Sequence, residues 1–169
     1  DLEISKKKNT FNFINQGFNL RPLDISASIA MSQLKRLKKM VKTRKFDRDM
    51  IIKLLKKSPK WDNQFTFFEP SKYLKPSWFS IPLLINRKYL KFKKTFLKKL
   101  EKNKIETRPI ISGNFINQPA IKLHKLRFNK NNFKISQEIE DRGFFIGLPT
   151  KKINLKDFKK LTDYLLDLK

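Results

Sequence analysis

Apolar residues recur at helical spacing in several parts of the chain. Between residues 24 and 58 they continue for so many turns that we predict one long helix, straight or bent, which Pro59 ends. Its apolar positions are Ile25, Ile29, Leu34, Leu37, Val41, Met50, Ile51, Leu54 and Leu55. The same periodicity predicts amphipathic helices over residues 87–103 and 155–166, the second capped by Asn154. A short helix is predicted over residues 135–141, with Gly143 at its end.

Shorter apolar runs between these helices predict β-strands. They cover residues 65–68, 78–85, 104–111 and 144–148. Pro82 lies inside the second run and indicates an edge strand or a bulge, because proline donates no hydrogen bond to a neighbouring strand. The order is therefore a long helix followed by β, β, α, β, loop, α, β, α, which is typical of an α/β layer. We place a domain boundary near residues 58–63.

The chain carries a formal net charge of +25, which raises the question of a nucleic-acid partner. Only eight of its 40 basic residues are arginine, the residue that fits phosphate and guanine best. The lysines are spread over the three longer predicted helices, and Lys, Asn, Ile and Phe are abundant together, as in AT-rich coding sequences. A lysine-rich nucleic-acid-binding module stays open as the less favoured alternative.

Other compositional features exclude several classes of site. The chain has no cysteine, so it forms no disulfide or thiolate metal site, and this is compatible with the cytoplasm. No apolar run approaches the roughly 18–20 residues that cross a bilayer. We find no Ser-His-Asp triad, metal-ligand spacing or phosphate loop, and we predict no metal site.

Residues 109–121 form the longest stretch without a charged residue, and we call them the uncharged segment. The segment reads P-I-I-S-G-N-F-I-N-Q-P-A-I and combines Ser, Asn and Gln with Gly113 and two prolines. Such a composition predicts a shaped polar loop, and loops of this kind often carry binding residues. Gly113 is expected to adopt a backbone conformation that other residues avoid.

Two segments go beyond generic patterning. Residues 17–37 read G-F-N-L-R-P-L-D-I-S-A-S-I-A-M-S-Q-L-K-R-L, and residues 105–121 read I-E-T-R-P followed by I-I-S-G-N-F-I-N-Q-P-A-I. In this order and at this separation they resemble the C-terminal part of the DegT/DnrJ/StrS family, whose members are pyridoxal-phosphate (PLP) enzymes acting on nucleotide-linked keto-sugars. The resemblance extends from about Phe11 to Leu166 and includes W-F-S-I-P at residues 78–82.

The resemblance implies an architecture. The chain would be the C-terminal part of a fold-type-I PLP-dependent transferase. Residues 1–58 would form the end of the large domain and the connecting helix, and residues 59–169 a small C-terminal α/β domain. A homodimer is implied for the parent enzyme, because active sites of the family lie between two subunits.

The resemblance also implies site residues. Asn19 and Arg21 match positions that reach the cofactor phosphate of the neighbouring subunit, and an amide and a guanidinium suit phosphate oxygens. Arg108 is a candidate for binding the sugar or its diphosphate, and the alternative is an ion pair with Glu106 or Glu69. Ser112, Asn114 and Asn117 are candidates for binding sugar hydroxyls, and the alternative is that these short side chains cap the loop itself.

The segment S-G-N-F-x-x-Q-P resembles the branch of 3-dehydratases of 4-keto-6-deoxy sugars. Some sugar aminotransferases of the family, which use glutamate, carry a histidine within the stretch that is Ser112 to Asn117 here. This chain has none there, which favours dehydration over transamination. The only histidine, His124, is flanked by lysine and is not expected to be catalytic.

The resemblance places the catalytic residue upstream of Asp1, as lysine in aminotransferases and histidine in 3-dehydratases. We therefore predict no catalytic residue in this chain, and we expect it to be inactive and to bind PLP weakly or not at all by itself. The complete enzyme would use PLP or its amine form, PMP, in the biosynthesis of lipopolysaccharide or another surface polysaccharide.

Overall fold

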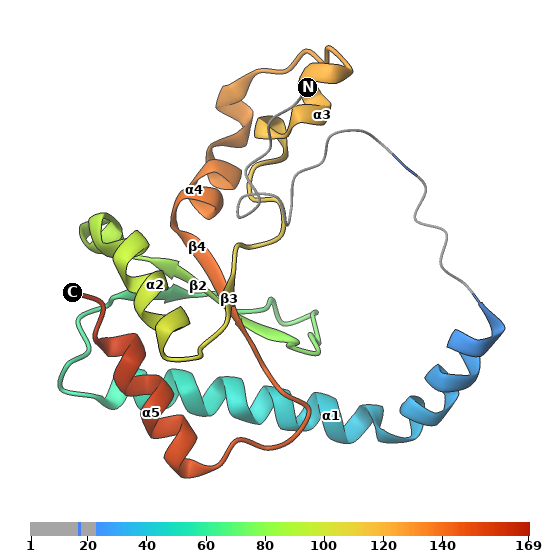
Figure 1. The fold of residues 1–169 in the computed structure, drawn as a ribbon, viewed down its shortest axis with the longest axis vertical. Helices are drawn as coiled ribbons and strands as arrows, with labels where there is room; N and C mark the ends of the chain where they lie inside the picture. Colours follow the sequence, from blue (N-terminus) through green and yellow to red (C-terminus); the bar gives the residue numbers. More distant parts are fainter. Residues whose placement is uncertain (1–16, 18–22) are drawn as a thin grey trace.

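The computed structural model describes residue 17 and residues 23–169 (Figure 1). The long helix predicted from residue 24 is present as α1 (Asp24–Lys57), with Asp24 in its first turn and Ser58 at its C-cap. A carboxylate in the first turn interacts favourably with the positive end of the helix dipole.

Four antiparallel strands form the sheet at the centre of the fold (Figure 1). They lie in the order β1-β2-β4-β3, which brings together strands far apart in the sequence. Their bounds are Phe65–Phe67 for β1, Ser80–Ile85 for β2, Thr107–Arg108 for β3 and Gly143–Gly147 for β4. The predicted order of helices and strands is therefore confirmed, although β3 is much shorter than predicted and the bounds of the other three strands differ by one or two residues.

The third strand is much shorter than the predicted 104–111. The residues after α2 (Lys93–Lys102) cap the C-terminus of that helix, since the Ile105 N–H donates to the Leu100 carbonyl oxygen at 3.0 Å. They are therefore not available for the predicted strand. Lys104 has a φ of 60°, and Ile111 has a φ of 49°, so the backbone leaves the extended conformation on both sides of Thr107–Arg108. Apolar alternation did not reveal these turns.

Pro82 lies in β2, which has a partner strand on each side, so β2 is not an edge strand. The Leu148 N–H donates to the Phe79 carbonyl oxygen, and the Asn86 N–H to that of Gln64. Successive residues of a strand direct their N–H and C=O groups to opposite neighbouring strands, so Phe79 faces β4 while Asn86 and Pro82 face β1. The last paired residue of β1, Phe67, lies opposite Leu83, so β1 has no paired residue opposite Pro82. Pro82 consequently leaves no strand hydrogen bond unmade.

The helical segment predicted over residues 87–103 divides into a 3₁₀ helix, η2 (Arg87–Phe92), and α2. Asn86 caps η2 by accepting from the Lys88 N–H. The predicted cap of the last helix, α5 (Leu155–Leu166), is confirmed, because the Asn154 side chain accepts from the Asp157 N–H at 2.8 Å. None of the helices in residues 23–169 has the length and apolarity that crossing a membrane requires.

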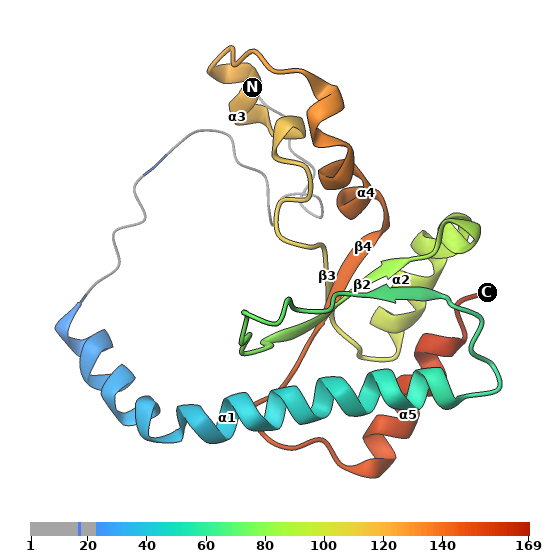
Figure 2. The ribbon, with the colours of Figure 1, turned by 180° about the vertical axis from the view of Figure 1, so that it is seen from behind.

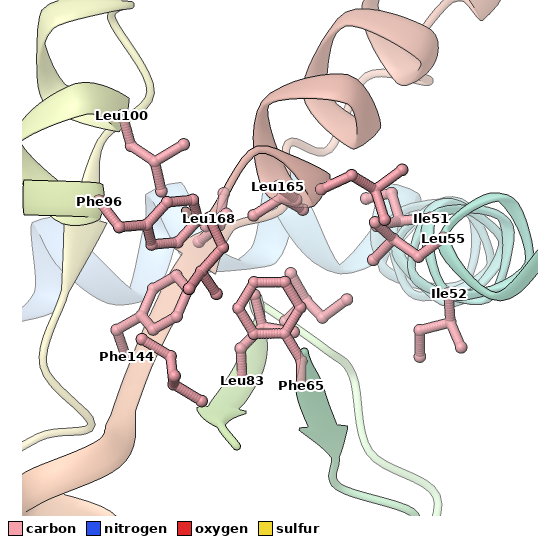
Figure 3. Packing of buried hydrophobic residues seen from close by; sticks show 14 of the residues in the cluster. Ile51, Ile52, Leu55, Phe65, Leu83, Phe96, Leu100, Phe144, Leu165 and Leu168 are labelled. Atoms are coloured by element: carbon pink, nitrogen blue, oxygen red, sulfur yellow. The ribbon is translucent and has the colours of Figure 1, made fainter. Parts of the chain in front are cut away.

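One face of the sheet carries the hydrophobic core, and α1, α2 and α5 contribute to it (Figure 3). Phe144 of β4 is 1% exposed and packs edge-on against Phe65 and Phe96, with ring centroids 6.0 and 6.1 Å apart. The second half of α1 joins this core through Ile51, Ile52 and Leu55. The apolar side chains of its first half are exposed, and Figure 2 shows that this half extends beyond the sheet; they include Ile25, Ile29, Leu34 and Leu37.

Asp47 of α1 is fully buried next to this core. Its Oδ2 accepts from the Ile153 N–H at 3.4 Å, and its Oδ1 has no hydrogen-bond partner among the described residues. Burial raises the pKa of Asp47, and the Ile153 N–H and the charge of Lys152 offset this in part. Because the folded-state pKa of Asp47 is raised, the contribution of this carboxyl to the free energy of unfolding is fully present at acid pH, below the unfolded pKa. That contribution is lost as the pH rises through the folded-state pKa and the buried group ionises.

We therefore expect Asp47→Asn to increase the free energy of unfolding at pH 7, by about 1 kcal/mol, since the buried charge is removed. The increase should disappear near pH 4, around the unfolded pKa of about 3.9. Urea denaturation at the two pH values measures this. Asp163→Asn on the exposed side of α5 is the control and should change little at either pH. An Asp47→Asn protein that is equally destabilised at both values would contradict the assignment.

Candidate functional site

The uncharged segment extends from the end of β3 into an arm that projects from the sheet (Figure 1). The arm contains a 3₁₀ turn, η3 (Phe115–Asn117), a short helix, α3 (Pro119–Leu123), a second 3₁₀ turn, η4 (Lys130–Phe133), and α4 (Lys134–Arg142). The predicted loop therefore includes two helical turns. Pro119 fits the first turn of α3, where a missing N–H costs no hydrogen bond.

Arg108 lies at the end of β3 and is exposed. Its Nε and Nη2 both donate to Glu106 Oε1, at 2.8 and 2.7 Å. The other predicted partner, Glu69, pairs instead with Arg48 at 3.2 Å. An exposed ion pair contributes about 0–1 kcal/mol, so Arg108 can exchange Glu106 for an anionic ligand at little cost.

A cavity of about 480 Å³ lies beside Arg108. Its apolar walls come from Phe79 and Phe145, whose rings meet edge to face with centroids 5.6 Å apart. The charged groups at its rim are Lys104, Glu106 and Arg108. Apolar walls with a few charged groups are typical of sites for small polar ligands.

Two of the candidate loop residues, Asn114 and Asn117, direct their side-chain amides towards α4. The Asn114 side chain is 2% exposed and donates through Nδ2 to Gln137 Oε1 of α4 at 3.0 Å. The exposed Asn117 donates through Nδ2 to the same Gln137 oxygen at 2.9 Å and to Glu140 Oε2 at 2.7 Å. Ser112 is half-buried, and its hydroxyl makes no hydrogen bond within the part of the chain that is described.

Gly113 adopts a φ of 63°, as expected for a position that favours glycine. A Cβ atom there would also lie 2.8 Å from Glu140 Cγ and 2.9 Å from Glu140 Cβ. The backbone of the loop and the side chain of Glu140 are therefore in direct contact. Gly143 ends α4 as predicted, although its φ is −81° and not left-handed. It is needed there because a Cβ would lie 2.3 Å from the Ile139 carbonyl oxygen.

Sequence reasoning missed Gln137 and Glu140. In the sequence they belong to an ordinary polar helix, Q-E-I-E-D-R, and nothing there marks them as partners of loop residues that lie 20 or more positions earlier. Their spacing of three residues does place them on one face of α4. That spacing is the one signal in the sequence that could have predicted that Gln137 and Glu140 contact the same partner.

The two remaining candidates, Asn19 and Arg21, lie outside the described residues. His124 is exposed at the end of α3. Among the described residues there is no group of three His, Cys, Asp or Glu side chains arranged to hold a metal ion.

Comparison with known proteins assigns the fold and motifs to a family. Residues 3–164 match the model of the DegT/DnrJ/EryC1/StrS aminotransferase family. The chain belongs to this family. The resemblance expected from the G-F-N-L-R and E-T-R-P segments is thus confirmed.

Two curated relatives are 3-dehydratases. The GDP-4-keto-6-deoxy-D-mannose 3-dehydratase of Escherichia coli is 28% identical over 138 residues, which are 82% of this chain and 34% of the relative. The protein of the same name from Yersinia pseudotuberculosis is 29% identical over 150 residues, 85% of this chain and 35% of the relative. The chain thus spans about a third of the length of these relatives.

Solved structures show the same fold. A GDP-4-keto-6-deoxymannose-3-dehydratase (ColD) variant with bound GDP-perosamine matches 95% of this chain and 40% of its own, with a TM-score of 0.72 and 24% identity. The E. coli dehydratase with bound hydrated PLP has a TM-score of 0.65 at 22% identity, over 95% of this chain and 40% of its own. PseC, a Helicobacter pylori aminotransferase, has a TM-score of 0.70 at 20% identity, over 90% and 38%. The predicted fold, part of a PLP-dependent transferase, is confirmed.

Proposed function

We propose that this chain is the C-terminal portion of a PLP- or PMP-dependent enzyme that removes the 3-hydroxyl group from a nucleotide-linked 4-keto-6-deoxy sugar. The observation that carries the proposal is the similarity to two 3-dehydratases across more than four fifths of this chain. We further propose that the enzyme is a cytoplasmic homodimer that serves surface-polysaccharide biosynthesis; one relative is named a lipopolysaccharide biosynthesis protein.

The second candidate is a nucleotide-sugar aminotransferase that uses glutamate. It is favoured by the structural match to PseC, which is an aminotransferase. The dehydratase has the stronger support, because its sequence similarity is higher and because the stretch from Ser112 to Asn117 contains no histidine. The division of the chain into residues 1–58 and 59–169 also stays a proposal.

The donor chemistry of this chain fits part of a cofactor site. The Asn19 amide and the Arg21 guanidinium supply N–H donors that suit the phosphate of a cofactor bound by the partner subunit. When bound, PLP or PMP supplies an electron sink that makes loss of the C3 hydroxyl possible. The role of this chain is to bind and orient: Arg108 faces the anionic part of the substrate, and Ser112 and Asn117 face its hydroxyl groups.

A variant of Arg108 tests the binding role. Arg108→Ala in the full-length protein should weaken the affinity for a GDP-linked sugar about 10- to 100-fold, because a hydrogen bond from a charged donor is lost. Isothermal titration calorimetry at physiological salt measures the affinity.

Arg127→Ala is the matched control, because it removes the same charge from an exposed position after α3. It should leave the affinity for the sugar unchanged. Equal losses in the two variants, or tight RNA binding that falls steeply with salt and no binding of the sugar, would favour the nucleic-acid-binding module instead.

A further inference from the structure

α4 faces the uncharged segment with two acceptor groups. Glu140 Oε2 accepts from the backbone N–H of Asn114 at 3.1 Å and from Asn117 Nδ2 at 2.7 Å. Gln137 Oε1 accepts from the side-chain amides of the same two asparagines. Four donor contacts of the loop therefore converge on two side chains of one helix.

Gln137 is itself held in orientation. Its Nε2 donates to Asp141 Oδ1 at 2.9 Å, one turn further along α4, which directs Oε1 towards the loop. Glu140 is fixed by its close fit to Gly113, where no side chain intervenes. Both acceptors are half-buried, so water competes less well for the loop donors than at an exposed position.

The helix that carries these acceptors is anchored to the rest of the fold. Arg142 donates through Nε to the Ile85 carbonyl oxygen at the end of β2, at 2.8 Å. Lys93 donates to the carbonyl oxygens of Glu140 and Asp141, at 3.2 and 2.6 Å. Burial lowers the pKa of Lys93, and the charges of Asp141 and Glu140 offset this in part. The sheet and α2 thus fix α4, and α4 fixes the loop.

We propose that Gln137 and Glu140 are positioning residues, which hold the uncharged segment in the conformation that presents Ser112 and Asn117 to the ligand beside Arg108. Asn114 acts with them, since its side chain faces α4 and is buried. The side-chain N–H groups of Asn117 donate to Gln137 and Glu140 of α4. The side-chain oxygen of Asn117, Oδ1, is therefore the group that meets a sugar hydroxyl. The ligand part of this inference rests on the proposed function.

Amide hydrogen exchange of the 169-residue chain tests the holding role. Glu140→Ala should accelerate exchange of the Asn114 amide about tenfold or more, because its acceptor is lost. Glu140→Gln retains one acceptor oxygen and should restore most of the protection. Unchanged exchange of β2 amides shows that the fold is intact. Glu101→Ala, which removes an exposed carboxylate of α2, is the control and should leave the Asn114 amide protected.

Titration of a GDP-linked sugar into the full-length protein tests the positioning role. Glu140→Ala should weaken binding about tenfold, with rescue by Glu140→Gln. A Glu140→Ala protein whose Asn114 amide stays protected, or whose loop opens without any loss of affinity, overturns the inference. A wild-type protein that binds no nucleotide-linked sugar contradicts the proposed function, and the exchange experiment then still decides whether Gln137 and Glu140 hold the loop.

Discussion

Replacing Phe144 with alanine is expected to lower the free energy of unfolding by about 3–5 kcal/mol, the usual cost of removing a buried phenylalanine side chain. Phe144 lies in a central strand, is 1% exposed and joins Phe65 and Phe96 in one aromatic cluster. A domain of this size has a total stability of roughly 5–15 kcal/mol, so the loss is a large share of it. Urea denaturation followed by circular dichroism measures the change.

Phe79→Ala is the matched control for this substitution. Phe79 is 60% exposed and touches Phe145 on the opposite face of the sheet, so its removal should cost less than about 1 kcal/mol. Equal costs for the two variants would show that the core does not centre on Phe144.

The full-length protein that contains this chain is expected to consume GDP-4-keto-6-deoxymannose when supplied with PLP and glutamate. The expectation follows from the two 3-dehydratase relatives and from the S-G-N-F-x-x-Q-P segment. A related dehydratase structure contains PLP and glutamate together, which is why both are supplied. Chromatography of the nucleotide-sugar over time measures consumption, and the reaction without glutamate is the control. Equal consumption without glutamate would contradict the expectation that glutamate takes part in the reaction.

Local patterns predicted the elements that depend on local physics. α5 follows from apolar residues one turn apart and from an N-cap whose partner is three residues away. The long helix α1 follows from the same periodicity and from the proline after its end. Both signals are contained in a single stretch of sequence, so they can be recognised without knowing the tertiary contacts.

Strand pairing and the support of the loop required the structure. Pro82 is tolerated in a central strand because the pairing of β1 with β2 ends at Leu83. The sequence of neither strand alone predicts this register. The loop of residues 109–121 was found from its composition, but the inward direction of Asn114 depends on Gln137, 23 residues later. Contacts of this kind arise from packing of α4 against the sheet, which periodicity does not encode.

Mass analysis of the product tests the central claim most directly. The full-length protein, supplied with PLP and glutamate, should convert GDP-4-keto-6-deoxymannose to a product that has lost the C3 oxygen and gained no nitrogen. A product that carries a new amino group would contradict the assignment as a 3-dehydratase and support the aminotransferase. Unchanged sugar in the presence of both PLP and glutamate would contradict the expectation that GDP-4-keto-6-deoxymannose is the substrate.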